Sequence, residues 1–297
     1  MKKFISVIIP TYSRPQLCLD AIRSVLLQSY TNFEITIVAH GKQNYISFLK
    51  EKIKDENNLI TYFYIGHKYL SEARNFGAEN SKGQWLAFLD DDDLWKAEKL
   101  AVFADVIEKN YNLDVLYSNF TTNYLNNPNQ QKSLKLYNKF YPDLHTAIQF
   151  GNFVSGGSAC AINKNSFIKI GKFDVTLGAC EDHDLWRRAI NNKLIFYFID
   201  KPLTIYRKMG DNLGSNNLRM QKFEEMHKKK ILLELPKYCL ERNYYYTLRE
   251  KYKNFKNYLN SNLILIKILN KLIKILVTLH HNNYNKIKKI YKNYILK

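Results

Sequence analysis

The sequence predicts an α/β fold, a sheet of parallel strands flanked by helices, followed by a basic α-helical C-terminal extension. Strand, helix and strand patterns follow one another within the first 40 residues. An apolar run later in the chain ends abruptly in four consecutive aspartates, residues 90–93. Beyond about residue 216 the chain is rich in Lys and Tyr and has no strand pattern. A length of 297 residues suits one large α/β domain, or one of about 200 residues with an appendage.

The first 40 residues predict a βαβ unit. Residues 4–9 are apolar and β-branched and end at Pro10, which is typical of a buried parallel strand. Ser13 and Pro15 are favourable residues for a helix start, and residues 33–39 form the second strand. Such a unit has a right-handed crossover, and its ligands bind in a crevice at the carboxyl ends of the strands.

Strand and helix patterns continue to alternate up to about residue 215. Further strands are predicted at residues 60–65, 85–89, 114–120, 154–162 and 194–199, with an extended segment at 201–207. Helices are predicted at residues 72–80, 99–110, 163–172 and 185–191. Residues 123–139 are polar, rich in Asn and Gln, and have little periodicity, so we interpret them as a loop.

The acidic run at residues 90–93 directly follows the predicted buried strand at residues 85–89. Four adjacent carboxylates repel one another, and a fold tolerates them best where a cation or a helix start neutralises the charge. One alternative is that Asp93 caps a helix beginning near Trp95 while the other three lie in solvent. That explains one aspartate of the four, and the run alone does not decide between a ligand site and a polar turn.

A second acidic cluster, residues 181–184, stands at the predicted start of helix 185–191. Two such clusters at the strand ends of one sheet suggest that one holds a cation and the other accepts a proton. The alternative is that these residues occupy a first turn because the helix dipole favours negative charge there. Cys180 and His183 are not obvious capping residues, which argues against that alternative.

The net charge of +18 is concentrated at the C-terminal end of the chain. Residues 220–297 contain 18 Lys and Arg against five Glu and no Asp. A basic region of this kind suits an anionic partner such as nucleic acid, an acidic lipid surface or an anionic saccharide. Residues 263–279 predict an amphipathic helix of about 25 Å, too short and too rich in lysine to span a bilayer. It could lie in a membrane interface, or pack on the α/β domain or a second subunit.

The four cysteines indicate neither a zinc site nor a disulfide framework. They are widely scattered, at Cys18, Cys160, Cys180 and Cys239, with no Cys-x-x-Cys pair. We expect reduced thiols, as in the cytosol. The apolar run at the N-terminus is too short for the hydrophobic region of a signal peptide, and no small-residue cleavage site follows it. The sequence therefore predicts a cytoplasmic protein.

Taken together, several segments resemble the family 2 glycosyltransferases of the GT-A fold. The matching segments are residues 6–14, Ala73-Arg74-Asn75 with Gly77, Gly83 with 88–95, 181–186, and Tyr206-Arg207. Their order and spacing fit over about residues 4–215. The resemblance implies a nucleotide-diphospho-sugar transferase fold with a Rossmann-like mixed sheet flanked by helices. It also implies a catalytic domain at residues 1–215, with residues 216–297 as a basic helical region.

The resemblance implies an inverting, metal-dependent enzyme. It would move a sugar from a UDP-hexose or UDP-N-acetylhexosamine donor to a hydroxyl of a glycan or lipid-linked acceptor, in surface polysaccharide, lipooligosaccharide or capsule synthesis. Asp92 would bind Mn²⁺ or Mg²⁺, which neutralises charge on the departing nucleoside diphosphate, and Asp90 would lie nearer the ribose. Asp182 would be the catalytic base and Glu181 would orient the site, because a sugar hydroxyl is too weak an acid to ionise without a base.

The resemblance also assigns residues to the nucleotide-sugar donor. These are Pro10, Thr11, Tyr12, Arg14, Ala39, Arg74, Asp90, Asp91 and Arg207. An aromatic face at Tyr12 would stack on uracil. Ala39 stands where the family usually has the aspartate that reads the base, and His40 is the neighbouring residue that would substitute. The histidine that usually follows Tyr-Arg is also absent, which leaves Arg207 or Lys208 as the phosphate partner.

Two rival functions remain open from the sequence. A catalytically inactive GT-A scaffold that binds nucleotide-sugar or glycan would explain Ala39, although both acidic clusters are intact. A nucleic-acid-binding protein would explain the positive charge, but no recognisable reading motif accompanies it, and we expect no nucleic acid partner. The C-terminal helices would bring the protein to an anionic membrane surface, at the inner face of the cytoplasmic membrane, or into a homo-oligomer.

Overall fold

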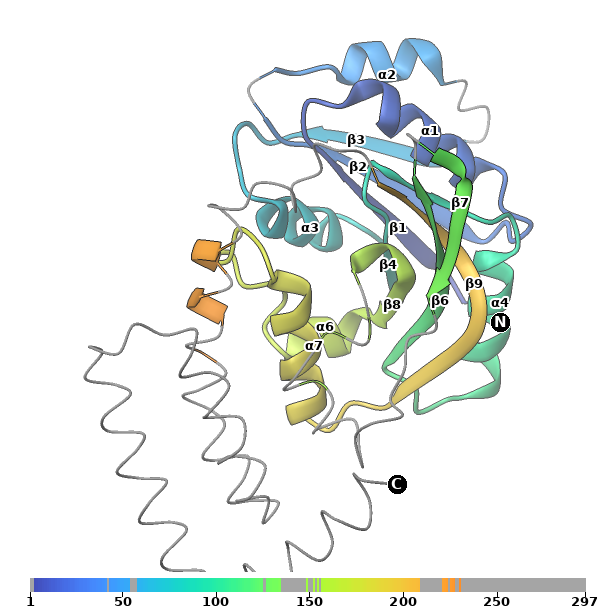
Figure 1. Ribbon diagram of the computed structural model, residues 1–297, viewed down its shortest axis with the longest axis vertical. Coiled ribbons are helices and arrows are strands. Elements are labelled where there is room, and N and C mark those ends of the chain that lie inside the picture. The colour runs from blue at the N-terminus through green and yellow to red at the C-terminus, as the bar shows by residue number, and fades with distance from the viewer. Residues whose placement is uncertain are drawn as a thin grey trace, which may run out of the picture. The chain divides into compact units, whose positions relative to one another are not determined.

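In the computed structural model the chain forms two compact units, Met1–Tyr137 with Gly151–Asn216, and Asn138–Phe150 with Asn217–Lys297. Figure 1 shows the helices and strands of the first unit. The structure describes residues 3–41, 43–53, 58–124, 127–134, 148, 152, 154, 156–208, 221–223, 225–227 and 230. In the second unit, helical residues are described at 221–223 and 225–227. All helices and strands named below belong to the first unit. The predicted division of the chain at residue 215 stays a prediction.

A mixed sheet of nine strands forms the centre of the described part of the first unit. The strands are β1 Ile5–Thr11, β2 Phe33–Ala39, β3 Ile60–Tyr64, β4 Trp85–Phe88, β5 Asp93–Trp95, β6 Val115–Tyr124, β7 Asn127–Leu134, β8 Cys160–Asn163 and β9 Phe196–Lys208. Their order is β3-β2-β1-β4-β8-β6-β9-β5, and β7 pairs with β6. Strands β1 to β4 are parallel, whereas β8 is antiparallel to both β4 and β6. The carboxyl ends of β1 to β4 therefore meet at one edge.

Helices flank this sheet. They are α1 Pro15–Leu26, α2 Ile46–Lys52, α3 Leu70–Glu79, α4 Lys99–Lys109, α6 Lys164–Lys169 and α7 Glu181–Asn191, with a short 3-10 helix η1 at Gly157–Ala159. Pro15 starts α1, because the fixed backbone angle of proline suits the first helical position. The side chain of Asn163 caps α6 by accepting hydrogen bonds from the backbone N–H groups of Asn165 and Ser166.

Strand β1 is buried on both faces, because helices pack on each side of it. Ile5, Val7 and Ile9 belong to a core cluster that includes side chains of α1 and α4. The alternate residue Ile8 faces α3, where a Cβ added at Gly77 would lie 2.6 Å from Ile8 Cγ2. Successive strand residues point to opposite faces of a sheet. A strand covered on both faces therefore needs the nearly continuous apolar run that the sequence shows.

Most of the predicted elements are observed, with ends displaced by a few residues. The strand predicted at 154–162 is wrong over most of its length, because residues 157–159 form η1 and the strand β8 begins only at Cys160. The segments predicted at 194–199 and 201–207 form one strand, β9. Residues 127–134, which we interpreted as part of a loop, form β7 and pair antiparallel with β6. That interpretation was wrong because a polar segment can complete a strand when a long neighbour offers it backbone hydrogen bonds. Residues 135–139 of the same predicted loop lie outside the described residues.

The helix start at Trp95, which the alternative interpretation of the acidic run required, is also wrong. Residues 93–95 form β5, which pairs antiparallel with β9, and α4 begins only at Lys99. Asp93 therefore belongs to a strand. Helix α2 was not predicted from the sequence.

The predicted amphipathic helix at residues 263–279 lies outside the described residues. Within the described part of the chain, no helix combines the length and the apolar character needed to cross a bilayer.

We predict that Gly83→Ala lowers the melting temperature. The Gly83 N–H donates to Ser6 Oγ at 2.7 Å, and a Cβ at this position would lie 2.5 Å from the backbone nitrogen of Ser6. That nitrogen is part of β1 and cannot move aside, so we expect a cost of about 1–3 kcal/mol. Thermal unfolding measures the effect. Gly66→Asn is the control, because φ is +71° there, which Asn tolerates, and nothing lies within 4 Å of an added Cβ. Equal losses in both variants would contradict the packing argument.

Candidate active site

A cleft opens at the carboxyl ends of β1, β2 and β4, and both acidic clusters line it. Its volume is about 320 Å³. Among the predicted site residues, those that line it are Pro10, Tyr12, Arg14, Arg74, Asp90, Asp91, Asp92, Glu181, Asp182 and Arg207. Thr11 and Ala39 are buried at the ends of β1 and β2. Residues that are far apart in the sequence are thus gathered around one cavity.

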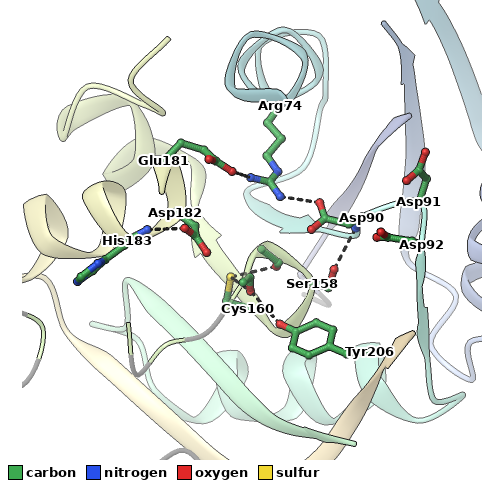
Figure 2. A network of polar contacts seen from close by, with 12 residues as sticks. Arg74, Asp90, Asp91, Asp92, Ser158, Cys160, Glu181, Asp182, His183 and Tyr206 are labelled. Carbon is green, nitrogen blue, oxygen red and sulfur yellow. Dashed lines mark hydrogen bonds and ion pairs between the residues drawn. The ribbon is translucent and has the colours of Figure 1, made fainter. Parts of the chain in front are cut away.

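Arg74 of α3 joins the two acidic clusters (Figure 2). Its side chain is 2% exposed. Nη2 donates to Asp90 Oδ1 at 2.5 Å, and Nη1 donates to Glu181 Oε1 at 2.6 Å. A buried cation between two carboxylates favours their ionised forms, because opposite charges interact strongly where water is excluded. The end of β4 and the start of α7 are therefore held together by one guanidinium.

The position of Arg74 depends on a glycine and an aromatic ring. A Cβ at Gly157 would lie only 3.0 Å from Arg74 Nη2. The guanidinium carbon lies 5.2 Å from the centroid of the Phe173 ring, at a distance typical of a cation–π contact. The resemblance assigned Arg74 to the donor phosphates, and that role stays a prediction. In the structure Arg74 acts as a bridge within the protein.

Three carboxylates of the acidic run converge on one point. Asp90, Asp92 and Asp93 each offer one oxygen, and these oxygens lie within 4.8 Å of one another. Burial raises the pKa of Asp92, opposed by Arg14, and burial together with the charge of Asp92 raises the pKa of Asp93 well above its ordinary value. A divalent cation prefers oxygen ligands and would relieve the repulsion, so the donor set fits Mn²⁺ or Mg²⁺. Asp93 was not predicted to belong to this set, although it is part of the run of four aspartates.

Ser158 and Lys99 hold the acidic turn in place, and no sequence pattern pointed to either. The Asp90 N–H donates to Ser158 Oγ at 3.0 Å (Figure 2). The Ser158 carbonyl accepts three hydrogen bonds, from Trp95 Nε1 at 2.9 Å, Lys99 Nζ at 3.0 Å and Thr204 Oγ1 at 3.0 Å. Lys99 is fully buried, and this burial lowers its pKa to about 7. Buried hydrogen bonds of Ser158 therefore hold the acidic turn in place.

Asp91 points away from the other aspartates in Figure 2 and fixes the loop after β1. Its carboxylate accepts from Thr11 Oγ1 at 2.7 Å and from the Tyr12 N–H at 3.3 Å, and it pairs with Arg14. Burial raises the pKa of Asp91 to about 7, although Arg14 opposes the shift. Arg14 also donates to Asp92 Oδ2 at 2.8 Å. Hydrogen bonds and ion pairs therefore connect residues predicted to contact the donor with the predicted metal ligand Asp92. These residues are Thr11, Tyr12, Arg14 and Asp91.

Arg207 anchors the acidic turn to α1. Its Nε donates to the Asp92 carbonyl at 2.6 Å, and Nη1 donates to Asp20 Oδ2 at 3.0 Å. Nη2 donates to the carbonyl oxygens of Leu17 and Asp91, both at 3.3 Å. These contacts engage the guanidinium within the protein, and the predicted phosphate contact of Arg207 stays a prediction.

Aromatic side chains form the wall of the cleft beyond β1. The Tyr12 ring contacts the rings of His40 and His67 edge to face, with centroids 5.3 and 5.9 Å apart. His40 is buried and lines the cleft. Ala39, directly before it, is fully buried, and its backbone pairs with Thr11 in the sheet. At this end of the cleft His40, and not Ala39, presents a polar group.

Glu181 and Asp182 occupy the first turn of α7 and also line the cleft. Asp182 Oδ2 accepts from Asn152 Nδ2 at 3.0 Å. Its Oδ1 accepts from the His183 N–H at 2.7 Å (Figure 2). Burial raises the pKa of Asp182, and it raises that of Glu181 to about 7, while Arg74 opposes both shifts. Asn152 lies in a segment without a recognisable sequence pattern, and it was not predicted as a site residue.

Comparisons with known proteins agree with this geometry. A family model described as Glycosyl transferase family 2 matches residues 6–171. An uncharacterised glycosyltransferase of Haemophilus influenzae is 29% identical over 214 residues, which cover 67% of this chain and 67% of that protein. The Escherichia coli protein named UDP-Glc:alpha-D-GlcNAc-diphosphoundecaprenol beta-1,3-glucosyltransferase WfgD is 32% identical over 117 residues, which cover 39% of this chain and 45% of that protein.

The fold is similar to that of a solved structure, S. aureus TarS 1-349 in complex with UDP-GlcNAc. The TM-score is 0.61 at 18% sequence identity, and the match covers 99% of this chain and 92% of that chain. At this identity the likeness bears on the fold alone. Together with the mixed sheet and its flanking helices, it confirms the predicted GT-A fold.

We predict that Arg74→Met destabilises the protein more at pH 8 than at pH 5. Because burial raises the pKa of Glu181 to about 7, the folded state binds its proton more tightly than the unfolded state does. Stability from this group is therefore greatest below pH 4.5, the ordinary pKa, and declines as pH rises towards 7. Without Arg74 the pKa rises further and the ionised carboxylates are left unpaired, at a cost of about 3–5 kcal/mol.

Urea unfolding at the two pH values measures this difference. Arg23→Met is the matched control, because Arg23 is 52% exposed and its ion pair with Asp20 lies at the surface. The control should change stability little at either pH. An equal loss at pH 5 and pH 8 in Arg74→Met would contradict the electrostatic role of the bridge.

Proposed function

Because this chain belongs to glycosyl transferase family 2, we propose that it moves a sugar from a UDP-sugar donor to a hydroxyl of an acceptor glycan, with inversion. One observation carries the proposal: carboxylates suited to a divalent cation and a separate, half-buried carboxylate, Asp182, line the same cleft. Two related proteins support UDP as the nucleotide. The E. coli relative is named for UDP-Glc, and TarS was solved with UDP-GlcNAc.

Asp90, Asp92 and Asp93 would hold the cation beside the donor diphosphate. When bound, Mn²⁺ or Mg²⁺ would neutralise the charge that develops on the leaving nucleoside diphosphate. Arg14 lines the same part of the cleft and its side chain is 26% exposed, which lets it turn from Asp92 towards a phosphate oxygen. The Tyr12 ring at the far wall offers a surface on which the base can stack.

Asp182 would accept the proton of the acceptor hydroxyl. As the hydroxyl oxygen bonds to the anomeric carbon, the bond from that carbon to the phosphate oxygen breaks, and UDP leaves with the electron pair. Attack opposite the leaving group inverts the anomeric carbon. Asn152 and the His183 N–H hold the two carboxylate oxygens in place. Burial raises the pKa of Asp182, which makes it a better proton acceptor once ionised.

The acceptor and the cellular location are also part of the proposal. A glycan or lipid-linked acceptor is supported by the name of WfgD, which contains a diphosphoundecaprenol. Surface polysaccharide synthesis at the cytoplasmic side of the membrane would suit such an acceptor. Residues 1–215 would carry the catalytic site, and the basic residues 216–297 would contact an anionic membrane or a second copy of the chain. A catalytically inactive scaffold is less favoured, since both acidic clusters line the cleft.

A panel of nucleotide sugars tests the proposal, with and without a GlcNAc-diphosphoundecaprenol acceptor. We expect release of UDP that requires Mn²⁺ or Mg²⁺ and stops on addition of EDTA. Asp182→Asn should bind UDP as the parent protein does and lose about 10²- to 10⁴-fold in turnover, the usual contribution of a general base. Normal turnover in this variant would exclude Asp182 as the base. Absence of release from every nucleotide sugar would contradict the transferase proposal.

We predict that Asp92→Asn weakens the enhancement of UDP binding by Mn²⁺, because an amide lacks the charge that holds the ion. Calorimetric titration with UDP, in the presence and absence of Mn²⁺, measures the enhancement. Asp105→Asn is the control. Asp105 lies on α4, its side chain is 59% exposed, and it forms a surface ion pair with Lys109 of the same helix. Equal enhancement in Asp92→Asn and the parent protein would remove Asp92 from the cation site.

A further inference from the structure

Arg14, in the loop after β1, reaches the acidic run with a nitrogen on each of two aspartates. Nη1 donates to Asp92 Oδ2 at 2.8 Å, and Nη2 pairs with Asp91 Oδ1. Asp92 is also one of the three carboxylates whose oxygens lie within 4.8 Å of one another. Within the described part of the chain, no other Lys or Arg side chain forms an ion pair with Asp92. Arg14 and a cation bound by these oxygens would therefore share the charge of one carboxylate.

The two arginines that pair with the proposed cation ligands differ in their freedom to move. Arg74, which pairs with Asp90, is 2% exposed and is buried in the bridge between the two acidic clusters. The side chain of Arg14 is 26% exposed and that of Asp92 is 15% exposed, so water can replace this contact. Asp91, by contrast, is 1% exposed. Arg14 can therefore release Asp92 while Nη2 stays paired with Asp91.

Two positive charges beside one carboxylate weaken each other's binding. Like charges repel, and the repulsion is stronger where water is partly excluded. The charge of Arg14 acts on Asp92, because it opposes the rise in pKa that burial causes there. A diphosphate carries negative charge, so in the cleft it would offer Nη1 another partner. The guanidinium would then leave the carboxylate to the cation.

We propose that Arg14 opposes the binding of a free divalent cation at the acidic run, and that a nucleoside diphosphate removes this opposition. This inference rests on the proposed cation site, and it names the residue that makes the cation and the donor bind together. Nη1 leaves Asp92 Oδ2 as the two bind, while Nη2 stays on Asp91. Arg14 acts through Asp92 and is therefore a positioning residue. By linkage, the cation strengthens diphosphate binding by the same factor as the diphosphate strengthens cation binding.

Calorimetric titration with Mn²⁺ in the absence of nucleotide measures the opposition directly. Arg14→Gln removes the positive charge and keeps an amide that can donate a hydrogen bond. We expect this variant to bind Mn²⁺ about 10-fold more tightly than the parent protein. The enhancement of UDP binding by Mn²⁺ should fall by about the same factor. A purely structural role of Arg14 predicts the opposite sign, since a loosened site binds the ion more weakly.

Two controls isolate the charge at this position. Arg14→Lys keeps the positive charge, so its affinity for Mn²⁺ should stay within about 3-fold of that of the parent protein. Arg23→Gln removes the same charge from α1, where the Arg23 side chain is 52% exposed and its ion pair with Asp20 lies at the surface. This second control should bind Mn²⁺ as the parent protein does, because salt screens exposed charges.

The parent protein offers a measurement that does not depend on a variant folding. Phenylglyoxal modifies exposed guanidinium groups, and mass spectrometry of the peptide that contains Arg14 gives the rate at this residue. Saturating Mn²⁺ should raise the rate, because the cation releases Nη1 from Asp92. Addition of UDP should lower it again, because the diphosphate then engages Nη1.

Three results would overturn this role of Arg14 and leave the transferase proposal intact. One is a folded Arg14→Gln variant, as judged by thermal unfolding, that binds Mn²⁺ no more tightly than the parent protein. Another is Arg14→Lys binding Mn²⁺ as tightly as Arg14→Gln. The third is a rate of Arg14 modification in the parent protein that Mn²⁺ does not raise. Failure of the parent protein to bind Mn²⁺ with or without UDP would instead contradict the proposed cation site, and this inference with it.

Discussion

The guanidinium of Arg74 pairs with Asp90 on one side and with Glu181 on the other, and the geometry of the cleft depends on this buried bridge. Removing a charge from water is costly, so a buried arginine persists only where carboxylates face it at short distance. The bridge fixes the end of β4 relative to the start of α7. Because Asp92 follows Asp90 and Asp182 follows Glu181, the same contact sets the distance between the proposed cation site and the proposed base.

The cleft holds more negative charge than the bridge can balance. Six carboxylates line it, against three guanidinium groups and one ammonium group: Asp90, Asp91, Asp92, Asp93, Glu181 and Asp182 against Arg14, Arg74, Arg207 and Lys208. Burial raises the pKa of several of these carboxylates, and for Asp91, Asp92 and Asp182 a neighbouring arginine opposes that shift only in part. A divalent cation at the acidic run would supply the missing charge, as the proposed transfer from a nucleoside diphosphate donor requires.

Buried hydrogen bonds hold the acidic run, residues 90–93, in place. The Ser158 carbonyl collects three donors, and Ser158 Oγ accepts from the backbone of Asp90. Arg207 binds the other side of the turn and connects it to α1. A catalytic site needs its groups fixed before the substrate arrives, since reorganisation during the reaction is costly. The buried Lys99 contributes to that rigidity, because its Nζ donates to the Ser158 carbonyl and to Thr204 Oγ1.

The sequence by itself determined the parallel half of the sheet and both acidic clusters. Short apolar runs such as residues 4–9 and 85–89 are typical of strands covered on both faces, and the residues that follow parallel strands meet at one edge of the sheet. Only the tertiary structure determined which side chains form ion pairs and hydrogen bonds with one another. Arg74 and Glu181 are 107 positions apart, and Asp90 and Ser158 are 68 apart, so no local pattern could show either contact. The same holds for β7, whose polar residues become a strand because β6 offers a partner, and for Asp93, whose place in β5 depends on β9. The local sequence determines which residues are apolar and the period at which they recur, and therefore which face of a strand or helix is buried. The partners of each side chain depend on the tertiary structure, because the assembled sheet brings distant loops together.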